Sequence, residues 1–237
     1  MEKDFDQFEK RLGVMFENKD LLKQAVVHRS YLNEHEEFKL SHNERLEFLG
    51  DAVLELVTTE YLFKTYPKSP EGTMTNWRAA VVNTNMLAQV SESLGVNDYL
   101  YLSKGEAKGS QKARELILAN ALEAIIGACY LDQGYDVTKK FIVTEILIKL
   151  KDIIKENTYI DPKSKLQEKT QEVLNVTPSY KVLKETGPDH KKHFIIGAYV
   201  DDEKVGEGEG YSKQQAQVAA AKDAIKKKKF LEVKGKE

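Results

Sequence analysis

The chain has 237 residues, of which 41% are hydrophobic and 31% charged. This composition is typical of a soluble globular protein of one large or two smaller domains, and it excludes a disordered chain. The longest weakly polar run, 116–131, contains Asn120 and Glu123 and is too short to cross a bilayer, so we expect no membrane association. Residues 1–6 lack an apolar secretion signal, and the single cysteine, Cys129, lies in an apolar run. We therefore expect a cytoplasmic protein.

The net charge of −2 conceals a difference between the two parts of the chain. From Asp161 onward there are 16 Lys and 13 Asp plus Glu, giving +3, and the preceding part carries −5. A mild basic bias does not establish nucleic-acid binding, but it indicates which part would do it.

The first part, from residue 5 to about 155, is predicted to be helical throughout. Its apolar residues recur at helical spacing, and no alternating strand pattern interrupts them. Pro67 and Pro70 end one run, and Gly105 and Gly109 mark a polar loop before another. We predict an all-helical domain over residues 1–157.

The pattern changes at a polar joint, 158–162. Beyond it we predict a helix at 163–174, strands at 179–184, at 193–200 and from 205, and an alanine-rich helix capped by Ser212. The predicted fold class is therefore α+β, with the helical domain followed by a small α-β-β-β-α domain over 163–232 and a tail at 233–237.

An acidic stripe marks the predicted helix near residue 50. At 100° per residue Glu44, Glu47, Asp51 and Glu55 fall within about 80° of one another, although like charges at this spacing repel. A capping box with Ser41 at the N-cap would explain Glu44, and Glu55 is expected to be solvated. Glu47 and Asp51 have no such explanation, which favours a metal or acid–base role.

A second polar pair lies in the apolar run 116–131. Asn120 and Glu123 are three residues apart, hence on one helical face, and Glu123 is the only charged residue of the run. A buried glutamate protonates, pairs with a cation or binds metal. Gly127 predicts close packing against another helix. Packing against the acidic stripe would bring together three carboxylates and an amide oxygen, a set that suits Mg²⁺ or Mn²⁺ rather than zinc.

These motifs resemble those of ribonuclease III, a family of endonucleases specific for double-stranded RNA. Residues 43–51, NERLEFLGD, match the family's nine-residue signature, and the C-terminal part resembles a double-stranded-RNA-binding domain. The other similar segments, in chain order, are 12–16, 28–31 (HRSY), Glu71 with Gly72, 117–132, PxY at 178–180, GPDH at 187–190 and GxGxGxSK at 206–213.

The resemblance implies a Mg²⁺-dependent hydrolase, with Mn²⁺ as a substitute and no organic cofactor. Glu47, Asp51 and Glu123 would hold the ion, with Asn120 as the fourth ligand, and Asp51 and Glu123 would stand closest to the chemistry. The expected products carry a 5′-phosphate and a 3′-hydroxyl. The family's usual tasks are rRNA and mRNA processing.

The resemblance also implies a homodimer, in which each subunit cuts one strand and leaves a short 3′ overhang. Phe48 would pack across the dimer interface. Glu44 and Glu71 would lie on the RNA-facing rim of the cleft.

Three RNA contacts are implied for the C-terminal domain, because this domain type reads the shape of a duplex. Gln167 and Glu168 would meet one minor groove, and His190 the next. Ser212 and Lys213, at a helix N-terminus, would meet phosphates across the major groove.

Asn120 departs from the family, which usually has Asp at this position. Natural variation with activity kept is the favoured interpretation, because the other three carboxylates are intact. An engineered change that traps uncut RNA and a natural loss of cleavage remain open. The alternative function is therefore a double-stranded-RNA-binding protein whose cleavage is weakened or lost. A metal-carboxylate enzyme acting on a small molecule is disfavoured by the C-terminal domain.

Overall fold

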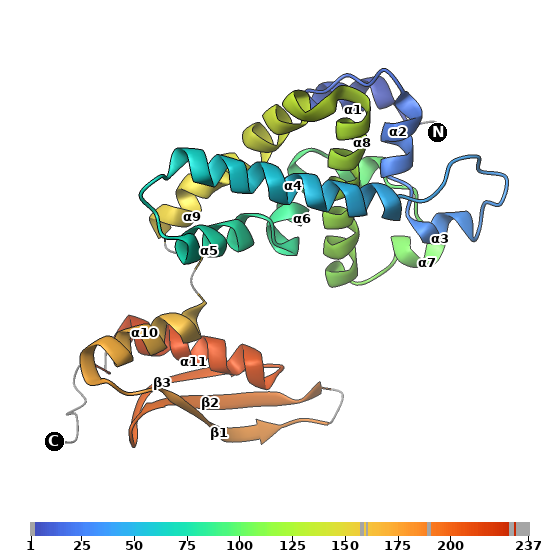
Figure 1. Cartoon of the computed structure of the whole chain (residues 1–237). Helices are drawn as coiled ribbons and strands as arrows, with labels where there is room; N and C mark the ends of the chain where they lie inside the picture. Colours follow the sequence, from blue (N-terminus) through green and yellow to red (C-terminus); the bar gives the residue numbers. More distant parts are fainter. Residues whose placement is uncertain (1–2, 157–158, 160, 189–190, 228–229, 231–237) are drawn as a thin grey trace. The chain divides into compact units, whose positions relative to one another are not determined.

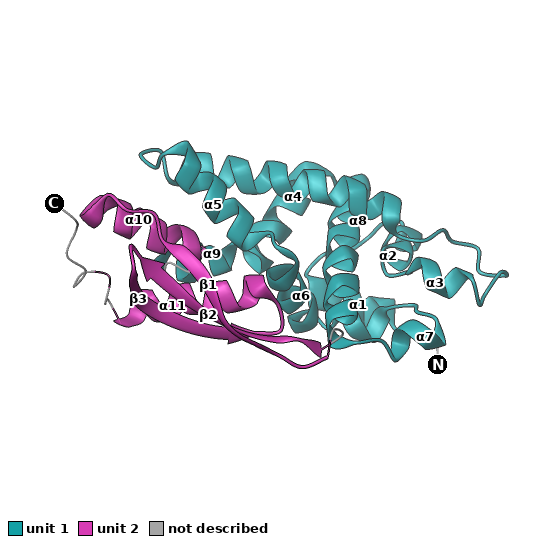
Figure 2. Ribbon diagram, turned by 90° about the horizontal axis from the view of Figure 1, so that it is seen from below, with its two compact units in different colours: residues 1–159 teal, residues 160–237 magenta. Residues whose placement is uncertain are grey.

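A computed structural model describes residues 3–156, 159, 161–188, 191–227 and 230. The chain forms two compact units, 1–159 and 160–237 (Figure 2), which divide within the predicted joint at 158–162. His190 and the tail at 233–237 lie outside the described residues. No helix in the described part of the chain is both long and apolar enough to span a membrane.

The first unit is helical, as predicted (Figure 1). In its described residues the β structure consists of one isolated parallel bridge between Val27 and Tyr101. The long helices α4 and α8 pack against each other within one hydrophobic core. The helices are α1 (Phe5–Leu12), α2 (Lys19–Ala25), α3 (Arg29–Leu32), α4 (Glu44–Thr65), α5 (Glu71–Val81), α6 (Thr84–Ser93), η1 (Val96–Tyr99), α7 (Lys104–Ala107), α8 (Gln111–Glu145), η2 (Leu147–Lys149) and α9 (Leu150–Glu156).

Helices α4 and α8 are in backbone contact where they cross. A Cβ atom added at Gly50 would lie 1.7 Å from the carbonyl oxygen of Glu123, and one at Gly127 would lie 2.2 Å from that of Leu46. Only glycine fits at either position, so the close packing predicted from Gly127 is confirmed.

The beginning of α4 differs from the prediction. Its N-cap is Asn43, without a side-chain capping bond, and Glu44 is the first helical residue. The Asn43 amide instead donates to the carbonyl of Ala25 (3.1 Å), and its backbone N–H donates to that of Val27 (2.9 Å). The predicted Ser41 capping box is therefore wrong, because contacts with a distant segment begin the helix two residues later.

Helix α8 changes direction at Gly134, whose φ of 74° is left-handed. The Thr138 hydroxyl donates to the carbonyl of Gly134 across this break (2.8 Å). Beyond it, the ammonium group of Lys139 pairs with the Glu60 carboxylate of α4 (2.8 Å). The second half of α8 is thereby attached to α4.

The second unit has the predicted α-β-β-β-α order. Its antiparallel sheet has the order β1-β2-β3, and α10 and α11 cover one face (Figure 1). The turn between β2 and β3 is only Asp201 and Asp202, so β3 begins two residues before the predicted position 205. The elements are α10 (Pro162–Leu174), β1 (Ser179–Thr186), β2 (His193–Val200), β3 (Glu203–Gly210) and α11 (Lys213–Lys227).

Three glycines of β3 allow α11 to lie against the strand at backbone distance. A Cβ atom would lie 2.4 Å from the Ala220 oxygen at Gly206, 2.1 Å from the Ala220 nitrogen at Gly208, and 2.7 Å from Gln215 Cβ at Gly210. The glycine-rich strand and the alanine-rich helix thus form one close interface.

Candidate active site

The α4–α8 crossing brings the predicted metal ligands into one cluster. Glu47 and Asp51 flank Gly50 on α4, and Asn120 and Glu123 precede Gly127 on α8. The carboxylate of Glu47 forms a hydrogen bond with the side chain of Asn120. Glu123 interacts electrostatically with both Asp51 and Glu47. The structure therefore assembles the four side chains that were singled out from two sequence segments.

The cluster is electrostatically unfavourable without a cation. Burial raises the pKa of Glu123 to about 7, and the negative charges of Asp51 and Glu47 contribute to this shift. Burial and the charges of Glu44 and Asp51 likewise raise the pKa of Glu47, against the hydrogen bond from Asn120. Such shifts indicate carboxylates that lack a positive partner.

The outer members of the stripe do have cationic partners. Arg29 lies 3.4 Å from the carboxylate of Glu44, and Arg78 lies 3.4 Å from that of Glu55. Glu55 is half exposed, in line with its predicted solvation, and it also pairs with Arg78. Helical spacing could not identify these arginines, because they belong to α3 and α5.

The donor chemistry of the cluster fits a hard divalent cation. Carboxylates and an amide oxygen are the ligands that Mg²⁺ accepts. As the described side chains stand, no group of three or more His, Cys, Asp and Glu is arranged to hold an ion. Asn120 here serves Glu47 as a hydrogen-bond donor. Metal binding by Glu47, Asp51, Asn120 and Glu123 stays a prediction.

An exposed apolar face borders the acidic stripe on α4. Phe48 is 82% exposed, Leu56 59% and Phe63 70%, and at 100° per residue they fall within about 80° of one another. Leu116 and Leu131 of α8 are also more than half exposed. Exposed groups of large apolar side chains are typical of interaction surfaces.

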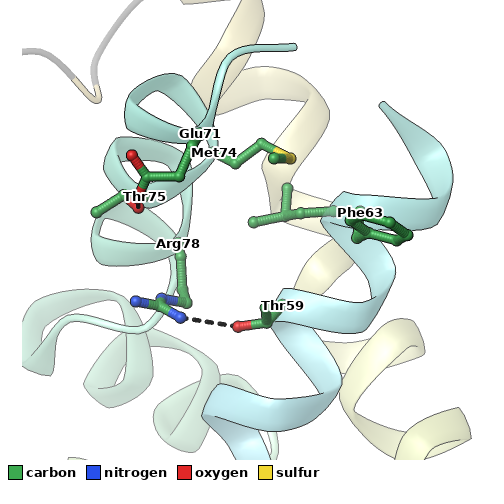
Figure 3. A pocket seen from close by; sticks show the side chains of 7 residues that line it. Thr59, Phe63, Glu71, Met74, Thr75 and Arg78 are labelled. Carbon is green, nitrogen blue, oxygen red and sulfur yellow. Dashed lines mark hydrogen bonds between the residues drawn. The ribbon is translucent and has the colours of Figure 1, made fainter. Parts of the chain in front are cut away.

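Glu71 lies apart from the cluster. It is the first residue of α5 and lines a pocket of about 170 Å³ between α4 and α5, where Arg78 donates to the hydroxyl of Thr59 (2.8 Å; Figure 3). Phe63 lines the same pocket, and twelve residues of helix place it about 18 Å along α4 from Asp51. A role for Glu71 at the RNA-facing rim stays a prediction.

The predicted RNA contacts that fall on described residues of the second unit, Gln167, Glu168, Ser212 and Lys213, are exposed. Gln167 and Glu168 lie on the surface of α10. Ser212 caps α11 as predicted, with its hydroxyl accepting from the N–H of Gln215 (3.1 Å), and the exposed Lys213 begins the helix.

The strand register brings the described residues that flank the β1–β2 loop to the end of the sheet where β3 leads into α11. Thr186 pairs with His193, and Phe194 pairs with Gly210. The loop between β1 and β2 and the start of α11 therefore share that end.

Comparisons with known proteins find a matching family for each of the two units. A family model described as ribonuclease-III-like matches residues 18–150, and the double-stranded RNA binding motif matches residues 162–228. Ribonuclease 3 of Nitratiruptor sp. is 40% identical over 94% of this chain and 96% of its own length, and that of Streptococcus gordonii is 44% identical over 92% and 93%. A solved nuclease domain of ribonuclease III from Campylobacter jejuni is 41% identical with a TM-score of 0.55, over 60% of this chain and 96% of its own.

A helical nuclease unit followed by a double-stranded-RNA-binding unit defines an endoribonuclease. The chain belongs to the ribonuclease III family.

Proposed function

We propose that the chain is a Mg²⁺-dependent endoribonuclease that cuts double-stranded RNA to 5′-phosphate and 3′-hydroxyl ends. The observation that carries this proposal is the α4–α8 crossing, which joins Glu47 and Asp51 to Asn120 and Glu123. By resemblance to the family, its tasks are rRNA and mRNA processing in the cytoplasm.

The four side chains of the cluster would hold the ion, with Asp51 and Glu123 nearest the reacting phosphate. A bound Mg²⁺ supplies a water that is more acidic and neutralises phosphate charge. Because the pKa of Glu123 is about 7, its carboxyl group would release a proton to solvent when the cation binds. No side-chain nucleophile is required.

The exposed face of α4 supports a homodimer. Phe48 would pack across the interface with Leu56 and Phe63, whose exposure is otherwise unexplained. The description of the Campylobacter jejuni structure refers to a region involved in dimer formation. Since the acidic stripe borders this face, each subunit would present one cluster beside the interface. Two such clusters would cut opposite strands and leave a short 3′ overhang.

The duplex would contact both units. Gln167, Glu168 and His190 would meet minor grooves, and Ser212 and Lys213 would meet phosphates at the N-terminus of α11. Glu44 and Glu71 would line the RNA-facing rim of the nuclease unit.

The test is cleavage of an end-labelled RNA duplex with and without Mg²⁺. We expect discrete products only with the metal, and at least a 1000-fold lower rate for Glu123→Gln, equivalent to about 4 kcal/mol in the barrier. Duplex binding in EDTA should persist in this variant. Glu115→Gln, on the same helix but outside the cluster, is the control and should cut within about twofold of the parent.

A second candidate function is duplex binding without cleavage, which is favoured by the use of Asn120 as a donor to Glu47. Retarded but intact duplex in the presence of Mg²⁺ or Mn²⁺ would support it and contradict the nuclease.

A further inference from the structure

The segment 25–30, which spans the end of α2 and the start of α3, bonds to Asn43, just before α4, and to the stretch 101–103, which leads through α7 into α8. It includes His28, Arg29 and Ser30, which lie within a motif of the sequence to which the proposed function gives no role. Its contacts reach residues 43 and 101–103, which are distant in the sequence.

On one side the segment holds the start of α4. Asn43 is only 4% exposed, and its side-chain amide donates to the carbonyl of Ala25 (3.1 Å). The backbone N–H of Asn43 donates to the carbonyl of Val27 (2.9 Å). The last residue before α4 therefore has two bonds to this segment.

On the other side the segment holds the chain that leads into α8. The N–H of His28 donates to the carbonyl of Tyr101 (3.1 Å), and the N–H of Tyr101 donates to the carbonyl of Val26 (2.9 Å). The hydroxyl of Ser30 accepts from the N–H of Ser103 (3.2 Å) and lies 2.8 Å from Nδ1 of His28.

Ser103 transmits this attachment toward α8. Its hydroxyl caps α7 by accepting from Glu106 N–H (3.2 Å), and α7 lies beside α3 (Figure 1). The chain then reaches Ser110, the N-cap of α8, within three residues of the end of α7.

The Gly50–Gly127 contact and the Lys139–Glu60 pair lie at or beyond the crossing, so the part of α8 before the crossing can still pivot relative to α4. Asn120 precedes Glu123, whose carbonyl faces Gly50 at the crossing, by three residues, so it lies about 4.5 Å along α8 before the contact. A small change in the crossing angle would therefore move Asn120 relative to Glu47. The segment 25–30 limits this freedom, because it bonds to Asn43 just before α4 and to the stretch 101–103 upstream of α8.

We propose that residues 25–30 are a positioning element that sets the angle between α4 and α8, with Asn43 and Ser30 as its positioning residues. The inference rests on the proposed function, because the distance that it controls is that between Glu47 and Asn120 in the proposed metal site. Neither Asn43 nor Ser30 touches the reacting groups in this scheme.

The experiment compares Ser30→Ala with Ser30→Thr, which keeps the hydroxyl group. Mn²⁺ binding to the RNA-free chain is measured by electron paramagnetic resonance, and kcat and KM are measured for duplex cleavage. We expect Ser30→Ala to weaken Mn²⁺ binding about tenfold and to lower kcat by a similar factor, as the loss of supporting contacts around metal sites commonly does. KM should stay within twofold, and Ser30→Thr should restore both quantities.

Ser93→Ala is the matched control, because it removes a serine hydroxyl bond, to the carbonyl of Val90, at the end of α6. It should leave Mn²⁺ binding and kcat unchanged. Asn43→Ala removes the side-chain bond on the α4 side and should reproduce the pattern of Ser30→Ala. If circular dichroism shows that Ser30→Ala does not fold, Asn43→Ala tests the positioning role in its place.

A folded Ser30→Ala protein with parental Mn²⁺ affinity and kcat would overturn the inference, whatever its melting temperature. Equal losses in Ser93→Ala would also overturn it, because they would reflect general destabilisation. In both cases the parent chain still binds Mn²⁺ and cuts, so the proposed function stands. A parent chain that neither binds Mn²⁺ nor cuts would overturn both.

Discussion

In the nuclease unit the predicted metal ligands lie around the point where two helices cross in backbone contact, whereas in the RNA-binding unit the described RNA-contact residues lie exposed on α10 and at the N-terminus of α11. Glu47 and Glu123 have raised pKa values because they are partly buried beside other carboxylates. Lys213 and Gln167 face solvent. The proposed chemistry of the first unit would therefore depend on packing, and the proposed recognition by the second unit would depend on separable surface contacts.

The largest effect is expected from Gly50→Ala. The added methyl group would lie 1.7 Å from the carbonyl oxygen of Glu123, so α4 and α8 would have to separate. We expect a loss of at least about 3 kcal/mol of stability, at or beyond the upper range for overpacked cores. Urea unfolding followed by the fluorescence of Trp77, the single tryptophan, reports on this unit alone. Gly72→Ala, in open space on α5, is the control, and a similar loss there would contradict the role of the crossing.

The next effect is a dependence of stability on pH without metal. The folded-state pKa of Glu123, about 7, lies above its ordinary value of 4.5. The contribution of Glu123 to the free energy of unfolding is therefore fully present below pH 4.5 and is lost as the pH rises through 7. Between pH 5 and 8 we expect a loss of at most about 3 kcal/mol in EDTA.

Glu123→Gln should remove this loss, so the difference between the two proteins isolates the contribution of Glu123. The same Trp77 fluorescence, measured at each pH, reports it, and Glu115→Gln should retain the parental slope. Equal slopes of stability against pH for Glu123→Gln and the parent would show that the charge of Glu123 does not destabilise the folded protein.

A smaller effect is expected in the RNA-binding unit. Lys213→Ala should weaken duplex binding in EDTA about fivefold and reduce the slope of log affinity against log salt by about one. Fluorescence anisotropy at several salt concentrations measures both. Lys222→Ala changes the same helix about 180° away and should have little effect. An equal loss in both variants would indicate general charge attraction instead of a contact at the N-terminus of α11.

The smallest effect is expected from Asn120→Asp. A fourth carboxylate strengthens cation binding, so the Mg²⁺ concentration at half-maximal cleavage should fall about threefold. Without metal, the variant loses the hydrogen-bond donor to Glu47 and adds a like charge, which should raise the pKa of Glu47 further. Equal half-saturation for both chains would show that residue 120 does not bind the ion.

The sequence predicted those parts of the site that depend on spacing within one helix. The positions of Glu47, Asp51, Asn120 and Glu123 follow from helical periodicity, and Gly127 predicted the packing that joins them. Contacts between distant segments were not predictable in this way. Arg29 and Arg78 pair with the acidic stripe from other helices, and Asn43 begins α4 by bonding to Ala25 and Val27.

The order of elements in the second unit was also predicted, because strand alternation and the Ser212 cap are local signals. The beginning of β3 was placed two residues late, since the acidic residues near the turn gave no strand signal.

The three glycines of β3 have a consequence for recognition. Because α11 is seated on backbone atoms rather than on long, adaptable side chains, the first turn of this helix is held at a fixed spacing from the hairpin end of the sheet. The spacing between these two parts of the domain is therefore fixed. A-form RNA repeats its grooves at a constant interval. A domain whose contact regions have a fixed spacing would therefore recognise such a helix without reading any base.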